Sequence, residues 1–209
     1  MTLLAAVIGD IVDSRKSPDR SRLQRQLERS LALANESAGP IEPLRPTVGD
    51  EFQGVFRTLG DAIRVTTILQ ALFAGEVDAR FGIGLGTRSP VESSVAGIED
   101  GSAWWSAREA IVEVKSRQVK GARYLRTWFA AASAEASVSA VNAYLVSRDQ
   151  ILSQLDDRAL RILSSSLRGS TQRRIAEAEG ISQSAVSQTM SRRGINAVLL
   201  GMELIAGAD

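Results

Sequence analysis

A Gly-Asp turn between two short apolar runs most constrains the fold of this chain. Gly49-Asp50 separates residues 44–48 from residues 52–56, and both runs have the length and composition of strands. This pattern is typical of a β-hairpin, in which two strands pair antiparallel without a helix between them. A doubly wound parallel sheet needs a helix between successive strands, so the hairpin argues against that fold.

The runs that flank the hairpin predict an alternating order of strands and helices. Residues 3–8 are continuously apolar, as expected of a strand buried on both faces. Residues 80–86 alternate, with glycine on one face, where a backbone or a ligand can approach closely. The order β-α-β-β-α-β-α-β predicts an α+β, ferredoxin-like fold, with an antiparallel or mixed sheet covered by helices on one face. The other expected elements are a helix between an N-cap at Ser17 and Gly39, helices at 60–73 and 102–114, and a strand at 124–129.

After residue 130 the pattern is helical throughout. The stretch 130–143 is rich in alanine and serine with few charges, and we interpret it as a boundary formed by a helix. The chain is therefore expected to hold a sheet-containing domain, residues 1–130, and an all-α domain, residues 131–209. The final helix, residues 195–205, is too apolar to stand alone. It either packs on its own domain or forms the seam of a homodimer.

Within the helical part, two short helices are expected at about 171–179 and 182–193, on either side of a left-handed turn at Gly180. Thr171 and Ser182 are their predicted N-caps. The stretch resembles the helix-turn-helix of sigma-factor region four and of LuxR-type regulators, which implies binding to double-stranded DNA. A scaffold for protein contacts or dimerisation is the alternative. The residues expected to face bases are Gln183, Ser184, Ser187, Gln188 and Ser191, and those expected near phosphates are Arg173, Arg174, Arg192 and Arg193.

Composition narrows the possible chemistry. The chain has no histidine and no cysteine, which excludes Ser-His-Asp and Cys-His catalysis, histidine-ligated zinc and disulfides. The net charge is only +1, but residues 158–196 carry seven arginines against two glutamates, which suits a polyanionic partner. No apolar run is long enough to span a membrane, and the short apolar start has no basic flank. We therefore expect a cytoplasmic protein without a membrane partner.

Two aspartates form the candidate metal site. Asp10 follows the first strand, and Asp50 lies in the hairpin turn. If these strands are neighbours, the carboxylates converge, and with backbone carbonyls they form a hard-oxygen site for Mg²⁺ or Mn²⁺. Asp13, Ser14 and Arg15 precede a helix, whose N-terminal N–H groups and dipole favour a phosphate. Alternatively, Asp10 and Asp50 are turn residues that bond to their own backbone.

Three motifs resemble the SatD family of bacterial proteins, over residues 1–129, and more distantly the palm of class III nucleotide cyclases and GGDEF-type diguanylate cyclases. The motifs are residues 8–15, 49–53 and 101–108. This resemblance implies a palm-like domain that binds a nucleotide with a divalent metal. The residues that it implies are Asp10, the carbonyl of Ile11 and Asp50 for the metal, and Arg108 for a triphosphate.

Two positions depart from the cyclase pattern. Trp104 replaces the asparagine that cyclases carry four residues before the arginine, and Pro46 replaces their base-selecting lysine. These departures favour nucleotide binding over cyclisation. Adjacent residues on a helix point about 100° apart, so Trp104 and Trp105 cannot both enter the core equally. One of them is expected to pack while the other stacks on a base or covers the site.

These observations predict a DNA-binding transcriptional regulator whose palm domain binds a nucleotide or nucleotide second messenger with a divalent metal. The alternative is a metal-dependent nucleotidyl transferase or cyclase-like enzyme that its C-terminal module tethers to DNA. A third possibility is an adaptor protein with a degenerate palm. The ligand, the operator and the sign of regulation are not encoded in any motif of the chain.

Overall fold

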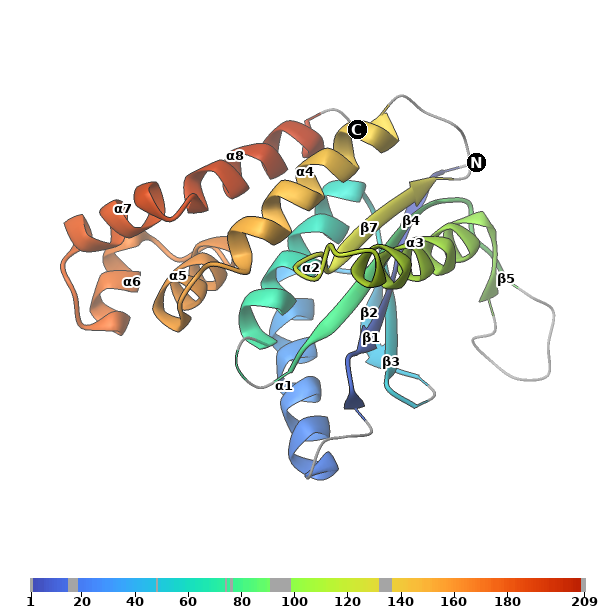
Figure 1. The fold of residues 1–209 in the computed structure, drawn as a ribbon, viewed down its shortest axis with the longest axis horizontal. Helices are drawn as coiled ribbons and strands as arrows, with labels where there is room; N and C mark the ends of the chain where they lie inside the picture. Colours follow the sequence, from blue (N-terminus) through green and yellow to red (C-terminus); the bar gives the residue numbers. More distant parts are fainter. Residues whose placement is uncertain are drawn as a thin grey trace.

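The computed structural model describes residues 2–14, 19–47, 49–73, 75, 77–90, 99–131 and 137–207. Its centre is a five-stranded sheet (Figure 1). Only the last two strands of this sheet pair parallel, so the sheet is mixed. In spatial order, the strands are β2 (Glu42–Pro46), β3 (Glu51–Phe56), β1 (Leu4–Ile11), β4 (Ala79–Gly86) and β7 (Thr127–Ala131); β5 (Ser89–Pro90) and β6 (Glu99–Asp100) form a separate short ladder.

Helices cover both faces of the sheet, whereas one covered face was expected. Along β1, Ala5 and Val7 join the core that includes α1 and α2, while Ala6 and Ile8 point the other way and pack with Ala107 of α3. The expectation was wrong because a strand that is apolar at every position must be packed on both faces. The helices are α1 (Arg20–Ala38), α2 (Leu59–Phe73) and α3 (Ser102–Val119).

The glycines of β4 allow α3 to lie directly on the sheet. A Cβ atom at Gly82 would lie 2.1 Å from the carbonyl oxygen of Ala107, and one at Gly84 would lie 2.2 Å from that of Ala103. The close approach predicted for this face is therefore made by a helix backbone and not by a ligand.

Helix α1 begins two residues later than predicted. Its N-cap is Asp19, whose side chain accepts a hydrogen bond from the backbone N–H of Arg22 at 2.8 Å. Ser17, the predicted N-cap, lies outside the described residues. Gly39 ends the helix in the left-handed conformation, as predicted.

An asparagine side chain caps each edge of the sheet. The amide of Asn35, in α1, donates to the carbonyl of Leu44 in β2 at 3.0 Å and accepts from its N–H at 2.8 Å. At the opposite edge, Asn142 of α4 (Ser137–Leu152) makes the same two bonds to Phe129 of β7, at 2.8 and 2.9 Å. Each amide thus occupies backbone groups that an edge strand otherwise leaves open.

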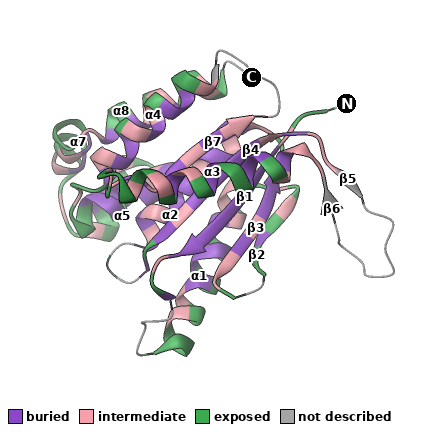
Figure 2. Ribbon diagram, turned by 45° about the vertical axis from the view of Figure 1, so that its right-hand side comes forward, coloured by how far each residue is buried: buried purple, intermediate pink, exposed green. Residues whose placement is uncertain are grey.

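Of the C-terminal helices, α5 and α8 pack on α2, α4 packs on β7, and α6 and α7 pack on α5 (Figure 1). One apolar core runs from Ala5 to Met202 and crosses the predicted boundary at residue 130 (Figure 2). Separate folding of residues 131–209 remains a prediction. None of the helices within the described ranges is long and apolar enough to cross a bilayer. The remaining helices are α5 (Asp157–Leu167), α6 (Gln172–Glu179), α7 (Gln183–Arg192) and α8 (Ile195–Ala206).

A buried ion pair joins α4 to the sheet. Arg148 and Asp149 are 0% and 1% exposed, and the Arg148 Nη2 lies 2.8 Å from Asp149 Oδ1. Arg148 also donates to the hydroxyls of Thr67 and Thr127. The other oxygen of Asp149 accepts the backbone N–H groups of Arg126 and Thr127, at 2.6 and 2.7 Å. Every charge in this network therefore has partners, as buried charges require.

Candidate functional site

The two predicted metal-binding aspartates lie side by side at the end of the β1–β3 ladder. Asp10 pairs in register with Glu51, and the N–H of Ile11 donates to the carbonyl of Asp50 at 3.1 Å. They open onto one cleft of about 810 Å³. Of the residues singled out in the sequence, the cleft is lined by Asp10, Ile11, Asp13, Ser14 and Asp50.

Cationic side chains hold Asp10. The Oδ2 atom of Asp10, whose side chain is 11% exposed, lies 3.2 Å from Arg80 Nη1 and 3.0 Å from Lys115 Nζ. Arg80 comes from β4, directly opposite Asp10 in register, and Lys115 comes from α3. The Nε of Arg80 also donates to Gln118 at 2.6 Å, which fixes the guanidinium. A divalent cation that used Asp10 would therefore replace two positive charges that now contact the same oxygen.

Asp50 is held differently. Its Oδ2 accepts a hydrogen bond of 2.6 Å from the hydroxyl of Ser14, which is buried. Asp13, two residues after the end of β1, adopts a left-handed backbone with φ of 53°, which turns the chain away from the strand. Arg15, the last residue of the predicted phosphate site, lies outside the described residues.

The oxygen donors of this cleft suit a cation that is shared with a ligand. Within the described ranges, no group of three or more acidic side chains is placed to hold a metal ion. Asp10 and Asp50 supply two carboxylates, with Ile11 beside them on the cleft wall. Mg²⁺ is commonly held by one or two carboxylates, several waters and substrate phosphates. Such a donor set therefore fits Mg²⁺ or Mn²⁺ bound with a phosphate, and does not fit an all-protein cage.

Trp104 and Arg108 do not line this cleft. They line a smaller cavity of about 270 Å³ beside β3, together with Gln53 and Trp105. The Nη1 and Nη2 atoms of Arg108 donate to the two carboxylate oxygens of Glu51, at 2.6 and 3.0 Å. These hydrogen bonds raise the pKa of Arg108. The predicted nucleotide-binding set is therefore divided between two cavities on the α3 side of the sheet.

The two tryptophans separate as the helical geometry predicts. Trp104 packs against the small core between α3 and β1, whereas Trp105 is 65% exposed. Trp105 and Arg108 share the wall of the smaller cavity. The exposed indole is thus the one that remains open to a ligand.

Five cleft residues were missing from the predicted site: Arg80, Lys115, Gln118, Val119 and Arg123. Lys115 belongs to a short run of charges, with Arg117 and Lys120, that is equally typical of a solvated helix face. Arg80 heads a strand without any motif around it. Its position next to Asp10 follows only from the β1–β4 register, so no local signal marks it.

Helices α6 and α7 have the predicted caps and turn. The side chains of Thr171 and Ser182 accept hydrogen bonds from the backbone at the starts of these helices, and Gly180 is left-handed with φ of 64°. Val186 and Met190 of α7 are buried. All the residues predicted to face bases or phosphates are exposed: Arg173, Arg174, Gln183, Ser184, Ser187, Gln188, Ser191, Arg192 and Arg193.

Several arginines of this region are engaged in ion pairs. Arg173 pairs with Glu177 along one helix face, and Arg193 reaches Asp156, each at 3.1 Å. A bidentate bond from Arg161 lowers the pKa of Glu179. Arg174 and Arg192 form no ion pair with any part of the chain that the structure describes.

A sequence model of the SatD family matches residues 4–203. This chain belongs to the SatD family. The match covers α4 to α7 and most of α8 as well as the sheet, so the region shared with the family extends well beyond the motifs noted in the first 129 residues. No curated protein matches this SatD chain.

Solved structures similar to this SatD protein include nucleotide cyclase domains. A dimeric guanylyl cyclase domain of the RhoGC fusion protein from the aquatic fungus Blastocladiella emersonii shares 12% identity over 54% of this chain and 74% of its own, with a TM-score of 0.43. A bacterial light-regulated adenylyl cyclase shares 14% identity over 68% of this chain and 80% of its own, also with a TM-score of 0.43. At such scores the similarity carries no conclusion about activity.

Proposed function

We propose that this SatD protein is a DNA-binding regulator whose palm cleft binds a nucleotide or nucleotide second messenger with a divalent cation. The observation that carries the proposal is the surface of α7. Its buried residues face α5 and α6, while five short polar side chains line its exposed side. Short polar side chains on the second of two such helices are the type that reads base edges in the major groove.

Charge supports the same orientation. Arg174 lies near the start of α6 and Arg192 at the end of α7, so each of the two helices carries one of these cations. Both are exposed and neither forms an ion pair with a described residue. An exposed guanidinium without an ion-pair partner among the described residues can bind a phosphate without first breaking an internal ion pair. An α-helix is about 10–12 Å in diameter, which fits the major groove, about 12 Å wide.

Substitutions in this surface are expected to weaken DNA binding in two different ways. Arg174→Ala should lower affinity for all duplex sequences and reduce the slope of log K against log salt by about 0.9, because one phosphate contact is lost. Gln188→Ala should remove about 1–3 kcal/mol of preference for a selected sequence over a random one. Fluorescence anisotropy with a duplex selected from a random library, at several salt concentrations, measures both effects.

Arg29→Ala provides the matched control, because Arg29 is an exposed arginine of α1, outside α6 and α7. It should leave both the affinity and the salt slope unchanged. If the Arg174→Ala, Gln188→Ala and Arg29→Ala variants bound DNA equally well, α7 would not be the helix that reads the bases. In that case a protein-binding role for these helices would replace the proposal.

A homodimer is part of the proposed function. Two copies of α7 would meet two half-sites one turn of DNA apart, about 34 Å. Helix α8 packs on its own chain through Ile195, Val198 and Met202, while Leu200 and Leu204 stay 56% and 68% exposed. These two leucines are the apolar side chains of α8 that remain available to a second copy.

The charges of the cleft support binding of cation and phosphate together. The cleft is lined by three acidic side chains, of which Asp10 and Asp50 are the proposed metal ligands, and by three basic ones, Arg80, Lys115 and Arg123. A lone phosphate would meet the carboxylates, and a lone Mg²⁺ would meet the cations. A Mg²⁺–phosphate complex satisfies both sets, since the metal takes the carboxylates and the released cations bind phosphate oxygens.

A nucleotide should therefore raise the melting temperature only when Mg²⁺ is present. At a ligand concentration near 100 times Kd, the gain in folding free energy is about 2.7 kcal/mol. Asp50→Asn should abolish the gain while keeping an oxygen for the Ser14 hydroxyl. Thermal-shift assays with ATP, GTP and cyclic dinucleotides, each with and without Mg²⁺, measure this.

Glu36→Gln, an exposed change in α1, is the control and should behave as the unmodified protein. If the nucleotide raised the melting temperature without Mg²⁺, or still raised it in Asp50→Asn, the ligand would bind outside this cleft. Nucleotidyl transfer would use the same two aspartates, and product formation in the same samples would identify it.

A further inference from the structure

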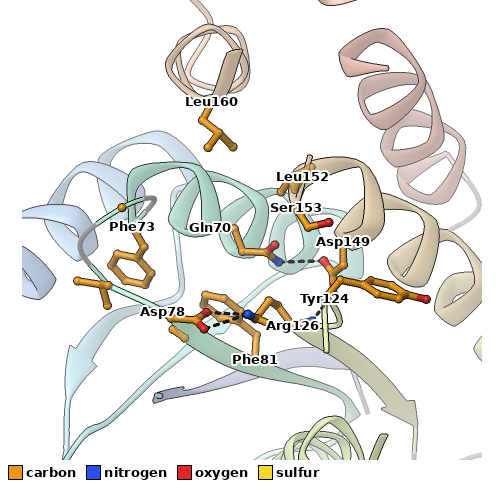
Figure 3. Close-up of a pocket in the computed structure, with 13 residues that line it drawn as sticks. Gln70, Phe73, Asp78, Phe81, Tyr124, Arg126, Asp149, Leu152, Ser153 and Leu160 are labelled. Carbon is orange, nitrogen blue, oxygen red and sulfur yellow. Dashed lines mark hydrogen bonds and ion pairs between the residues drawn. The ribbon is translucent and has the colours of Figure 1, made fainter. Parts of the chain in front are cut away.

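A third cavity, of about 220 Å³, lies where the palm meets the C-terminal helices (Figure 3). Phe73 of α2 and Phe81 of β4 form its apolar wall, which Leu152 and Leu160 continue on the helical side. Gln70 and Asp78 add polar atoms. None of these residues lines the aspartate cleft, so the two sites are separate.

The size and lining of this cavity suit a single aromatic ring. Protein interiors contain few voids larger than a water molecule, and an engineered apolar cavity of about 150 Å³ already admits benzene. Phe73 and Phe81 are 2% and 0% exposed, and their rings lie nearly parallel, at an interplanar angle of 10°. The two packed rings therefore form a rigid floor beneath the cavity, while Leu152 and Leu160, at 6% and 7% exposed, border its narrow apolar space.

The polar atoms of the cavity favour a ligand that donates hydrogen bonds. Gln70 donates its Nε2 to Thr127 at 2.9 Å and to Asp149 at 3.1 Å, and its Oε1 accepts no bond from any described residue. At the rim, Asp78 accepts two bonds from Arg126, at 2.6 and 2.9 Å, and a carboxylate can accept more. Two acceptors thus face the space beside the apolar wall (Figure 3).

The same arrangement disfavours an anion. Arg126 is the cation among the described lining residues, and Asp78 already binds it through both oxygens. The buried Asp149 adds a second carboxylate, which Arg148 neutralises from behind. An anionic ligand would therefore approach carboxylates without a free positive charge to receive it.

We propose that this cavity binds a neutral or cationic heteroaromatic compound about the size of a nucleobase. The ring lies between Leu152 and Leu160, above the floor that Phe73 and Phe81 form, and its N–H groups donate to Gln70 Oε1 and to Asp78. The ligand touches α2 and β4 on one side and Leu160 of α5 on the other. Because α5 packs on α6 and α7, an occupied cavity changes how firmly the reading helices are held to the palm. This last step rests on the proposed function, whereas the binding itself does not.

Three compounds of nearly identical shape test the ligand class. Benzamidine and benzamide carry N–H donors, and benzoate carries a negative charge in their place. Titration calorimetry with the full chain, without DNA or Mg²⁺, should show binding of benzamidine, benzamide and adenine. Benzoate should bind at least about tenfold more weakly than benzamide. Equal affinity for benzoate, or no binding of any of the four, would overturn the proposal.

Two substitutions test the location. Leu160→Phe fills the cavity from α5, and Ser153→Phe obstructs its mouth from an exposed position, where folding is least affected. Each should lower affinity for benzamidine about tenfold or more. Ser147→Phe, an exposed change in α4 away from the cavity, should not. Binding that survives in both obstructed variants would place the ligand outside this cavity.

The regulatory step has its own readout. Saturating benzamidine should change the affinity for the selected DNA duplex in the unmodified protein and not in Ser153→Phe. If benzamidine binds but DNA affinity stays constant, the cavity is a ligand site without control over α7. If DNA does not bind at all, the proposed function fails while the ligand site stands.

Discussion

Arg148→Met is expected to lower the free energy of unfolding by about 3–5 kcal/mol, the usual penalty for breaking a buried ion pair. The substitution preserves much of the apolar length of the side chain but leaves Asp149 charged and 1% exposed, without its guanidinium partner. It also removes the donors to Thr67 and Thr127, which tie α4 to α2 and to β7. Urea unfolding followed by circular dichroism measures the change.

Two comparisons separate this network from the general effect of losing an arginine. Arg29→Met removes an exposed arginine from α1 and should change stability by less than about 0.5 kcal/mol. Arg148→Lys keeps the charge and loses the planar fork, so it should fall between the two. A loss below about 1 kcal/mol for Arg148→Met would mean that water or Gln70 compensates Asp149.

Gly84→Ala is expected to destabilise the protein by about 3 kcal/mol, the upper end of the range for overpacking a well-filled core. The added Cβ would lie 2.2 Å from both the Ala103 carbonyl oxygen and the Ala107 nitrogen, so the backbone of α3 must move away from β4. Such a movement alters the surroundings of Trp104 and Trp105. Thermal unfolding together with tryptophan fluorescence of the native state detects both consequences.

The control for this variant is Gly207→Ala. At Gly207 the backbone φ is −84°, and the nearest atom to an added Cβ is 3.5 Å away. Stability there should change by less than about 1 kcal/mol. If Gly84→Ala proved as mild as Gly207→Ala, the close contact between α3 and β4 would have to be looser than the structure shows.

The sequence predicted the order of strands and helices because each element carries its own periodicity. The hairpin around Gly49-Asp50 and the caps at Thr171 and Ser182 are local patterns, and the structure contains them. The placement of α3 is not local. Residues 80–86 show only that something approaches the glycine face, and a helix backbone and a ligand meet that condition equally well.

The candidate site likewise combines contacts that local patterns predict with contacts that depend on how distant elements pack. Asp10 and Asp50 could be placed together because one belongs to a strand end and the other to the turn of the neighbouring hairpin. The contact between Asp10 and Arg80 depends on the register of two strands that are 70 residues apart. The bond from Arg108 to Glu51 likewise depends on the rotation of α3 above β3, which no motif encodes. Glu51 is held by that bond.

The asparagines at positions 35 and 142 determine how this molecule can associate. Each side-chain amide takes up the backbone donor and acceptor that an incoming extended segment would need at the middle of the outermost strand. A further strand therefore cannot pair at the middle of either edge of the sheet. This also prevents chains from aggregating edge to edge. We therefore expect this protein to assemble through the surfaces of its helices.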